Sequence, residues 1–464
     1  MIRRGSVAIA EPVARQLVEH LARPDGDEDV CFAIWFPSEG ASRTTAVIHH
    51  VLLPEDGDRL VHGNASFTGQ YFARAMKSAL RHGGGIALLH SHPLGVAWQG
   101  LSDDDRAAEA GHAGAAIGAT GLPLLGLTLA VQSGRWSARF WRRTAPRTYE
   151  PDYCDSVRVV GIALDPSFAP AMPPPRSKPE LTRTVSVWGD EKQADLARLH
   201  VGVVGAGSVG ALVAESLARM GVARVSLIDA DTVKRHNLDR LLHSSVAKIG
   251  MAKVDVLAAT LPASATADGF EVIPAKAWIT DEDGYRAALD CDVLFSCVDR
   301  PWGKRVLNHI AYAHLIPVVD GGLAIYAPQW KLKHADWSVR TVAPGRACLE
   351  CVKAYDPGLV AAEMEGHLDD PRYIEGLPDD HVLKRNENVF PFSMSVAAHE
   401  VLQFVALVTG MKRMHEVGEQ RYHYYPGTMD VNTTLKCAPG CPHAAAVATA
   451  DKKYRIYRTP SPSS

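Results

Sequence analysis

The sequence predicts an α/β protein with two domains, on the strength of three observations. A short apolar strand pattern in the first half ends in two histidines at alternate positions, His90 and His92. A second apolar pattern, residues 200–204, runs directly into a glycine-rich turn and a helix, which is typical of a parallel β-α-β unit. A proline-rich stretch, residues 166–179, separates the two halves.

The length and composition allow a boundary to be set for each domain. With 464 residues and 47% hydrophobic content, the chain is long enough to bury two or three cores. We expect an N-terminal domain over residues 1–165, a semi-rigid extended linker over residues 166–179 and a C-terminal domain over residues 180–464. The net charge of -3 gives no reason to expect nucleic-acid binding.

The chain is expected to be cytoplasmic and to have no membrane partner. Its first residues do not lead into the apolar core of a secretory signal. One uncharged run, residues 113–131, approaches the length of a membrane span, but Gly121-Leu122-Pro123 interrupts it. This run therefore predicts a helix end, a turn and a strand.

The first candidate site is a metal site formed by residues that follow a buried strand. His90 and His92, two positions apart on a strand, project to the same face, and Pro93 ends the strand. A downstream acid such as Asp105 completes a set of two nitrogen ligands and one oxygen ligand, which leaves a fourth zinc position open for water. The alternative is a pair of surface histidines beside an acidic helix start that Ser102 caps.

The order His-x-His-Pro, a spacer and Ser-x-x-Asp resembles the JAMM metalloproteases (also called JAB or MPN+), which cut isopeptide or peptide bonds after ubiquitin-like tails. The resemblance implies a JAMM-like α/β metalloprotease domain in which His90, His92 and Asp105 hold a catalytic zinc. It also implies that Ser102 hydrogen-bonds the oxyanion. The spacer between His92 and Ser102 is a little longer than is usual in the family.

The same resemblance implies an upstream glutamate that acts as general base toward the zinc-bound water. Glu28 is the first choice, because it directly precedes the apolar strand pattern of residues 30–36, where the family carries its glutamate. Glu39, at the far end of that strand, is the alternative.

The second candidate site is a nucleotide site in the C-terminal half. The glycine loop Gly205-Ala206-Gly207-Ser208-Val209-Gly210 precedes a helix expected from about residue 211 to 220, and the next strand pattern ends in Asp229. Free N–H groups at a helix start attract phosphate, and an acid at the second strand end can bind ribose hydroxyls. Alone, this motif indicates a nucleotide or dinucleotide site, with an NAD-dependent oxidoreductase as the default.

The residues that follow do not fit a dehydrogenase. The series Asp231, Asn237, Arg240, Lys253 and Asp299 resembles the adenylating domain shared by ubiquitin-activating enzymes and the ThiF and MoeB sulfur-carrier activators, over roughly residues 183–441. The resemblance implies a Rossmann-like fold and attack on the α-phosphate of ATP by the C-terminal carboxylate of a small ubiquitin-fold protein. Two anions must then meet, so their charge has to be neutralised.

The resemblance also implies a role for each residue. Asp229 would bind the ribose, Arg240 and Lys253 would clamp the triphosphate, and Asp299 would hold magnesium. Arg183 resembles an arginine that reaches the partner's ATP site across a homodimer, although an exposed arginine in a strand-like entry segment is the alternative. The implied cofactor-binding set is Gly205, Gly207, Gly210, Asp229, Asp231, Asn237, Arg240, Lys253 and Asp299. In isolation, Lys253 also fits a solvated helix lysine and Asn237 an Asx turn.

Four of the eight cysteines form two close pairs. Cys348-x-x-Cys351 and Cys437-x-x-x-Cys441 predict a tetrahedral structural zinc, since disulfides are not expected in a chain of this size without a secretory signal. Cys154 lies in a polar segment that we expect to be exposed, and it is the one candidate for an internal thioester. Its acidic neighbours would raise the pKa of its thiol. Transfer of an activated acyl group to an external thiol is therefore expected.

Two further patterns belong to the second domain. Residues 316–322 predict a strand that ends at a Gly321-Gly322 bend, where an extended substrate tail could approach the backbone closely. Residues 395–409 predict an apolar helix that ends at Gly410 and lies either in the core or at a dimer contact.

Together the two resemblances predict a bifunctional enzyme of a bacterial-type ubiquitin-like or sulfur-carrier pathway. It would trim or release the tail of a small carrier protein with a C-terminal glycine and activate the same tail. The expected cofactors are ATP, Mg²⁺ and two zinc ions, one catalytic and one structural. A conjugating protein or a sulfur donor is a further expected partner, and the chain is expected to form a homodimer. The alternatives are an NAD-dependent oxidoreductase and a scaffold with one inactive half.

Overall fold

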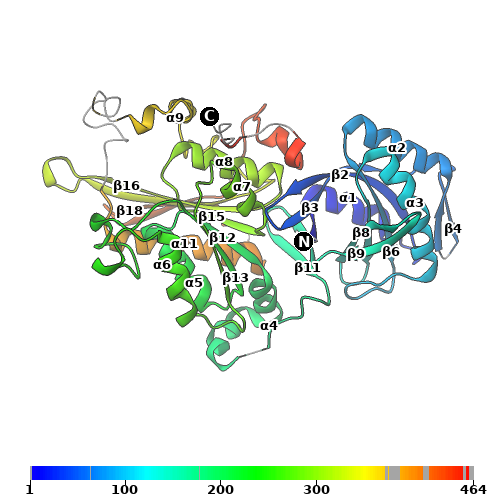
Figure 1. The fold of residues 1–464 in the computed structure, drawn as a ribbon, viewed down its shortest axis with the longest axis horizontal. Helices are drawn as coiled ribbons and strands as arrows, with labels where there is room; N and C mark the ends of the chain where they lie inside the picture. Colours follow the sequence, from blue (N-terminus) through cyan, green and yellow to red (C-terminus); the bar gives the residue numbers. More distant parts are fainter. Residues whose placement is uncertain are drawn as a thin grey trace. The chain divides into compact units, whose positions relative to one another are not determined.

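The chain folds into two compact units (Figure 1). A computed structural model describes residues 3–62, 64–176, 178–370, 375, 387–410, 417–452 and 456–458. Unit 1 comprises Met1–Pro173 with two short segments from later in the chain, Ala313–Leu315 and Ala446–Tyr454. Unit 2 comprises Pro174–Tyr312, Ile316–Ala445 and Arg455–Ser464. The first division between the units thus falls inside the proline-rich stretch.

Unit 1 is built on a mixed nine-stranded sheet with the order β11-β10-β1-β3-β2-β6-β7-β8-β9. Its strands are β1 (Arg4–Ala10), β2 (Val30–Glu39), β3 (Arg43–Leu52), β6 (Gly85–His92), β7 (Leu124–Ala130), β8 (Arg135–Ala145), β9 (Thr148–Tyr153), β10 (Ser156–Val160) and β11 (Leu164–Phe168). Its helices are α1 (Glu11–Leu21), α2 (Gly69–His82) and α3 (Asp103–Thr120), and a separate hairpin is formed by β4 (Arg59–His62) and β5 (Asn64–Phe67).

The sheet of unit 1 curls around its own core. Strand β8 contacts β10 and β11 as well as its ladder partners, and the Trp136 backbone N–H donates to Ser167 Oγ at 3.0 Å. Strands β6 and β7 are buried along nearly their whole length, which explains why their sequences are continuous apolar runs rather than alternating ones. Trp35, Trp136 and Phe140 are among the buried side chains of this core.

Unit 2 is built on an eight-stranded sheet with the order β14-β13-β12-β15-β16-β17-β18-β19. Its strands are β12 (His200–Val204), β13 (Arg224–Ile228), β14 (Glu271–Ala275), β15 (Val293–Ser296), β16 (Val318–Tyr326), β17 (His334–Val342), β18 (Glu419–His423) and β19 (Thr428–Asn432). Its helices are α4 (Thr182–Arg198), α5 (Ser208–Arg219), α6 (Lys253–Thr260), α7 (Glu282–Leu289), α8 (Pro301–Ala313, whose last residue is assigned to unit 1), α9 (Pro357–Met364) and α11 (Phe390–Thr409).

The sheet of unit 2 combines a Rossmann-like parallel half with an antiparallel half. Strands β12 to β16 pair in parallel, whereas β17, β18 and β19 continue the sheet as antiparallel strands. Strand β12 lies between β13 on one side and β15 on the other, so the strand order reverses direction at β12. Ligands of open α/β sheets bind at such a point, beyond the carboxyl ends of the strands.

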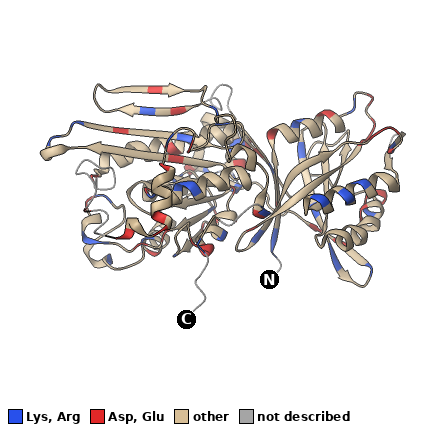
Figure 2. Cartoon of the chain, turned by 90° about the horizontal axis from the view of Figure 1, so that it is seen from above, with Lys and Arg blue, Asp and Glu red and all other residues tan. Residues whose placement is uncertain are grey.

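Helix α11 is a core helix of unit 2. It is the one helix among the described residues with the length and apolar composition of a membrane span, but 67% of its most apolar stretch is buried inside the protein. It packs against α5, β16 and β17, and it ends at Gly410, whose φ of 55° is left-handed. Elsewhere, Lys and Arg are interspersed with Asp and Glu along the elements of both units (Figure 2).

Several local expectations need correction. Residues 166–168, expected in the linker, form the end of β11, because this edge strand pairs with β10 and an edge tolerates proline. The Gly321-Gly322 bend is wrong: β16 continues through both glycines, since they pair with Val339 and Ser338 on β17. A Cβ at Gly321 would lie 2.5 Å from Glu400 Oε1, so this glycine instead lets α11 approach.

Two other expectations agree with the structure more closely. Residues 113–131 divide into the end of α3, a turn and β7, as predicted. The helix after the glycine loop begins at Ser208 rather than near residue 211, because the second half of the loop already forms its first turn.

We predict that Phe404→Ala destabilises unit 2 by about 3–5 kcal/mol, whereas Leu402→Ala on the same helix has a much smaller effect. Phe404 is fully buried, with its ring centroid 5.6 Å from that of Phe295, while Leu402 is 53% exposed. Urea unfolding followed by circular dichroism measures both changes. Equal losses for the two variants would contradict the burial of this face.

Candidate functional site

The first candidate site lies where β6 ends in unit 1. Strand β6 pairs with β2 on one side and with β7 on the other, which places His90 opposite Val30 and Thr128. His90 Nε2 lies 3.5 Å from one Asp105 oxygen and His92 Nε2 lies 3.4 Å from the other. The structure therefore brings together all three metal ligands that the sequence predicts, with ligand atoms within 4.8 Å of one another.

The start of α3 presents Asp105 to the histidines. Ser102 is the N-cap: its Oγ accepts from the Asp105 backbone N–H at 3.1 Å, and Asp105 Oδ2 accepts from the Ser102 N–H at 2.9 Å. Asp103 and Asp104 are exposed, so the helix start distinguishes Asp105 among the three consecutive aspartates. The capping role considered for Ser102 is present, and it coexists with an Asp105 that faces both rings.

The charges of this site are strongly coupled. Partial burial raises the pKa of Asp105, but its interactions with the nearby His90 and His92 rings outweigh this effect and hold the pKa well below its usual range. The hydrogen bond to Asp105 in turn raises the pKa of His92. Two imidazole nitrogens and one carboxylate, close together, also form a set of donor atoms that suits Zn²⁺.

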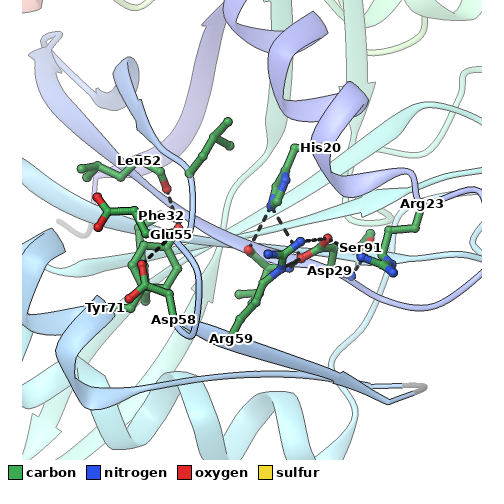
Figure 3. Close-up of polar contacts among 12 residues, drawn as sticks. His20, Arg23, Asp29, Phe32, Leu52, Glu55, Asp58, Arg59, Tyr71 and Ser91 are labelled. Atoms are coloured by element: carbon green, nitrogen blue, oxygen red, sulfur yellow. Dashed lines mark hydrogen bonds and ion pairs between the residues drawn. The ribbon is translucent and has the colours of Figure 1, made fainter.

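An ion-pair network around the buried carboxylate of Asp29 holds the backbone next to Glu28 (Figure 3). Asp29, which is 1% exposed, donates its N–H to Ser91 Oγ at 3.0 Å and accepts from the Ser91 N–H at 3.1 Å. Arg59, from the β4–β5 hairpin, contacts the two oxygens of the Asp29 carboxylate at 2.6 and 2.9 Å. Asp29 thus ties the start of β2 to the residue between the two histidines.

Glu28 lies within electrostatic reach of the histidines. Burial raises the pKa of Glu28, while positive charge on His90 and His92 would lower it. Glu39 lies at the other end of β2, beyond the Trp35 and Gly85 pair, and its Oε2 accepts from Thr44 Oγ1 at 3.0 Å. Of the two glutamates considered for the general base, Glu28 is the one that interacts electrostatically with all three candidate ligands.

Two residues that the sequence did not single out lie beside the Nδ1 atoms of the histidine rings. Gln99 Oε1 lies 3.1 Å from His92 Nδ1, and Glu109 Oε1 lies 3.8 Å from His90 Nδ1. Glu109 stands one helical turn after Asp105 on α3, and this spacing is the signal that could have identified it.

The second candidate site lies at the carboxyl ends of β12, β13 and β15 in unit 2. The glycine loop joins β12 to α5, whose first N–H groups are available to an anion. Gly205 has a φ of 94°, and a Cβ there would lie 2.5 Å from Cys297 O at the end of β15. A Cβ at Gly210 would lie 1.9 Å from Gly205 O, whereas Gly207 faces open space. The three glycines therefore have distinct roles, and Gly207 leaves room for a ligand.

Asp229 and Lys253 meet at this edge of the sheet. Asp229 Oδ2 accepts from the Ala206 N–H at 2.7 Å and Oδ1 accepts from the Asp231 N–H at 2.7 Å, so this carboxylate also holds the glycine loop. Burial raises the pKa of Asp229. Lys253 Nζ lies 2.7 Å from Asp231 Oδ2 and 4.0 Å from Asp229 Oδ2.

Arg240 joins this group through its backbone, because Ser208 Oγ donates to Arg240 O at 2.8 Å. Its guanidinium pairs with Asp239 at 2.8 Å. Asn237 Oδ1 accepts from the Lys234 N–H at 2.9 Å, which forms the local turn given above as the alternative to a role in nucleotide binding.

Two of the predicted residues stand apart from these contacts. Asp299 is exposed, and it follows β15, the strand next to β12. Arg183 is exposed in the first turn of α4, which is a helix and not a strand-like segment. The described contacts do not bring Arg183 to the glycine loop.

The four paired cysteines gather in unit 2, with their sulfur atoms within 4.8 Å of one another. Cys348 Sγ lies 3.6 Å from Cys441 Sγ. Backbone N–H groups point at three of the sulfurs at 3.3 Å: Cys348 N to Cys437, Cys351 N to Cys348, and Ala438 N to Cys351. Such N–H groups stabilise thiolates, so the arrangement fits a tetrahedral metal site of four cysteines.

The expectation that Cys154 is exposed is wrong. Its side chain is fully buried in the core of unit 1, and burial raises the pKa of its thiol. Its polar neighbours Asp152 and Asp155 suggest exposure, but the backbone at Cys154 pairs with β8 and the thiol points inward. Cys297 also has a raised pKa through burial. Neither thiol is suited to carry a thioester.

The loop at the reversal point of a parallel sheet, with acids and a lysine beside it, defines a nucleotide-binding α/β domain. The chain belongs to the ThiF family, which it matches over residues 181–442. This match concerns the C-terminal part of the chain.

Several curated proteins are similar to this part. The tRNA threonylcarbamoyladenosine dehydratase of Bacillus subtilis is 37% identical over 103 residues, which are 22% of this chain and 40% of that protein. The SAMP-activating enzyme E1 of Haloferax volcanii is 28% identical over 174 residues, 37% of this chain and 60% of that protein. The ubiquitin-like modifier-activating enzyme 5 of Arabidopsis thaliana is 26% identical over 281 residues, 56% of this chain and 57% of that protein. The chain thus spans about half the length of these relatives.

Among solved structures, Escherichia coli MccB with ATP is similar at a TM-score of 0.45 and 16% identity, over 58% of this chain and 75% of that chain.

We predict that Gly210→Ala destabilises unit 2 by about 1–3 kcal/mol, since the added methyl meets backbone rather than a movable side chain. Gly207→Ala should cost no more than about 1 kcal/mol, the usual penalty for alanine at an N-cap. Thermal unfolding of the two variants decides the matter. A smaller loss for Gly210→Ala than for Gly207→Ala would show that the loop packs differently.

Proposed function

We propose that unit 2 adenylates the C-terminal carboxylate of a small ubiquitin-like or sulfur-carrier protein. One observation carries the proposal: a glycine loop at the start of α5 has the backbone of Arg240 on Ser208 and the Asp231–Lys253 pair close by, in a chain of the ThiF family. Relatives described as a SAMP-activating enzyme E1 and as ubiquitin-like modifier-activating enzymes support the choice of substrate.

The residues account for the chemistry of such a step. A carboxylate oxygen attacks the α-phosphorus of ATP, an acyl-adenylate forms and pyrophosphate leaves. Both reactants are anions, so the helix N–H groups, Arg240 and Lys253 would offset their charge. Lys253, now paired with Asp231, would exchange that partner for a phosphate oxygen. Asp299 would hold magnesium, which when bound would supply positive charge to the phosphates.

An NAD-dependent oxidoreductase is the weaker alternative for unit 2. The glycine loop alone fits a dinucleotide, but a dehydrogenase gives no joint role to Arg240, Lys253 and Asp299.

The acyl group, once activated, would pass to a thiol of another protein, either a conjugating protein or a sulfur donor. The chain's own thiols are poor acceptors. Four cysteines form one cluster, Cys31, Cys154 and Cys291 are buried, and burial raises the pKa of Cys297.

For unit 1 we propose a JAMM-like zinc hydrolase that acts on the tail of the same small protein. His90, His92 and Asp105 would hold zinc, which would supply a bound water of lowered pKa when present. Glu28 would take the proton of the attacking water, and the burial that raises its pKa brings a carboxylate closer to the range suited to a general base. A scaffold role for unit 1 is the alternative, and the position of Glu28 beside the ligands favours catalysis over it.

The cysteine cluster of unit 2 would hold the second, structural zinc. All four positions of its tetrahedron would be taken by Cys348, Cys351, Cys437 and Cys441, which leaves no open position for chemistry. Two zinc ions per chain are therefore proposed.

We predict that ATP–pyrophosphate exchange requires a small ubiquitin-like protein ending in glycine and is lost in Asp299→Ala. The loss follows from removal of the proposed magnesium ligand. Asp283→Ala, which removes an exposed carboxylate on α7, is the matched control and should exchange at the wild-type rate. Exchange that persists in Asp299→Ala, or that needs no protein substrate, would refute the assigned role.

We predict that Glu28→Gln lowers cleavage of a ubiquitin-like protein with a C-terminal extension by about 10²–10⁴-fold, the range expected when a general base is lost. Zinc content, measured by metal analysis, should stay at the wild-type value because Glu28 is not a proposed ligand. Glu39→Gln tests the other glutamate and should cleave like the wild type. Full activity in Glu28→Gln would remove it from the mechanism.

A further inference from the structure

A buried carboxylate lies behind His90 and is not one of the proposed ligands. Glu109 is 1% exposed, and its Oε1 lies 3.8 Å from His90 Nδ1. The other ring nitrogen, Nε2, faces Asp105 at 3.5 Å. Both carboxylates come from α3, one helical turn apart, so a single helix faces the two nitrogens of one imidazole ring.

The Glu109 carboxylate is fixed by partners that are themselves buried. Arg139, from β8, has no exposed surface and donates Nε–H to Glu109 Oε2 at 2.8 Å, while its Nη2 contacts Oε1. Trp141 Nε1 also donates to Oε2. A Cβ at Gly126 on β7 would lie 2.2 Å from Glu109 Oε2 and 2.6 Å from Arg139 Nε, so the glycine provides the space for the ion pair.

Thr128 lies beside the Nε2 atom of His90. Its Oγ1 accepts from Arg139 Nη1 at 2.7 Å and lies 3.3 Å from His90 Nε2, so its hydroxyl hydrogen is available to an unprotonated Nε2. A neutral imidazole that accepts at Nε2 carries its proton on Nδ1, which is the nitrogen facing Glu109. The same ring orientation recurs at His92, where Nδ1 faces Gln99 Oε1 at 3.1 Å.

We infer that Glu109 is a positioning residue that holds His90 in the Nδ1–H tautomer and leaves the Nε2 lone pair for a metal. The inference rests on the zinc hydrolase function proposed for unit 1. Metal-bound histidines generally donate their second N–H to a carboxylate or carbonyl, which orients the ring and increases its basicity. A buried ion pair is a costly way to stabilise a core, so its position behind a ligand favours this role.

The test compares zinc affinity and the His90 tautomer in three proteins. Glu109→Gln removes the charge, and Glu109→Gln/Arg139→Gln removes both charges so that no uncompensated arginine stays buried. Asp152→Asn is the control, since Asp152 pairs with Arg142 at 2.6 Å in the same unit without contacting either histidine. Zinc affinity is measured by competition with a chelator, and the tautomer by ¹⁵N–¹H correlation spectra of the metal-free protein.

We expect either Glu109 variant that folds to bind zinc roughly 10- to 100-fold more weakly, the usual effect of losing such a partner. The His90 spectrum should change from the Nδ1–H form to a mixture, and Asp152→Asn should match the wild type in both measurements. If the wild type binds zinc and a folded variant keeps both its affinity and its tautomer, the inference fails while the zinc site stands. If the wild type does not bind zinc at these ligands, the proposed hydrolase fails, and an unchanged tautomer in the metal-free variant would still overturn the role of Glu109.

Discussion

In both units, the carboxyl end of a central, fully paired strand faces the first turn of a helix, and each candidate site depends on this juxtaposition. Along β6 and β12 the backbone polar groups are satisfied by neighbouring strands, so polar side chains can turn toward a ligand only where the ladder ends. The two units use the helix start in opposite ways. Helix α3 supplies its own anion, Asp105, whereas α5 begins with small residues and leaves its N–H groups for an anion from outside.

The site of unit 1 lies between two ion pairs, each built on a buried carboxylate. The Asp29–Arg59 pair fixes the chain on the side of Glu28, and the Glu109–Arg139 pair lies behind His90. Buried charges are expensive unless they are paired and hydrogen-bonded, and each of these carboxylates has several donors. Because the donors are held by the fold, the polar groups near the histidines are already oriented before a metal or a substrate arrives.

The sequence was informative where chemistry follows local spacing. The spacing of His90 and His92 and the glycine loop depend on strand and helix periods, and the structure brings each group together as predicted. The sequence did not predict contacts between segments that are distant along the chain. The burial of Cys154 depends on pairing with β8, and the continuation of β16 through Gly321 depends on pairing with β17. Glu109 shares a helix face with Asp105, but its role becomes visible only through Arg139, which is distant in sequence.

Gly126 illustrates how far a site extends beyond its polar atoms. It contributes no side chain and has no part in any motif, yet the space above it is occupied by the Glu109–Arg139 pair. A methyl group there would displace charges that have no solvent to move into. Under the zinc role proposed for unit 1, a substitution at this inconspicuous position would therefore weaken metal binding even though Gly126 is neither a ligand nor an acid–base residue.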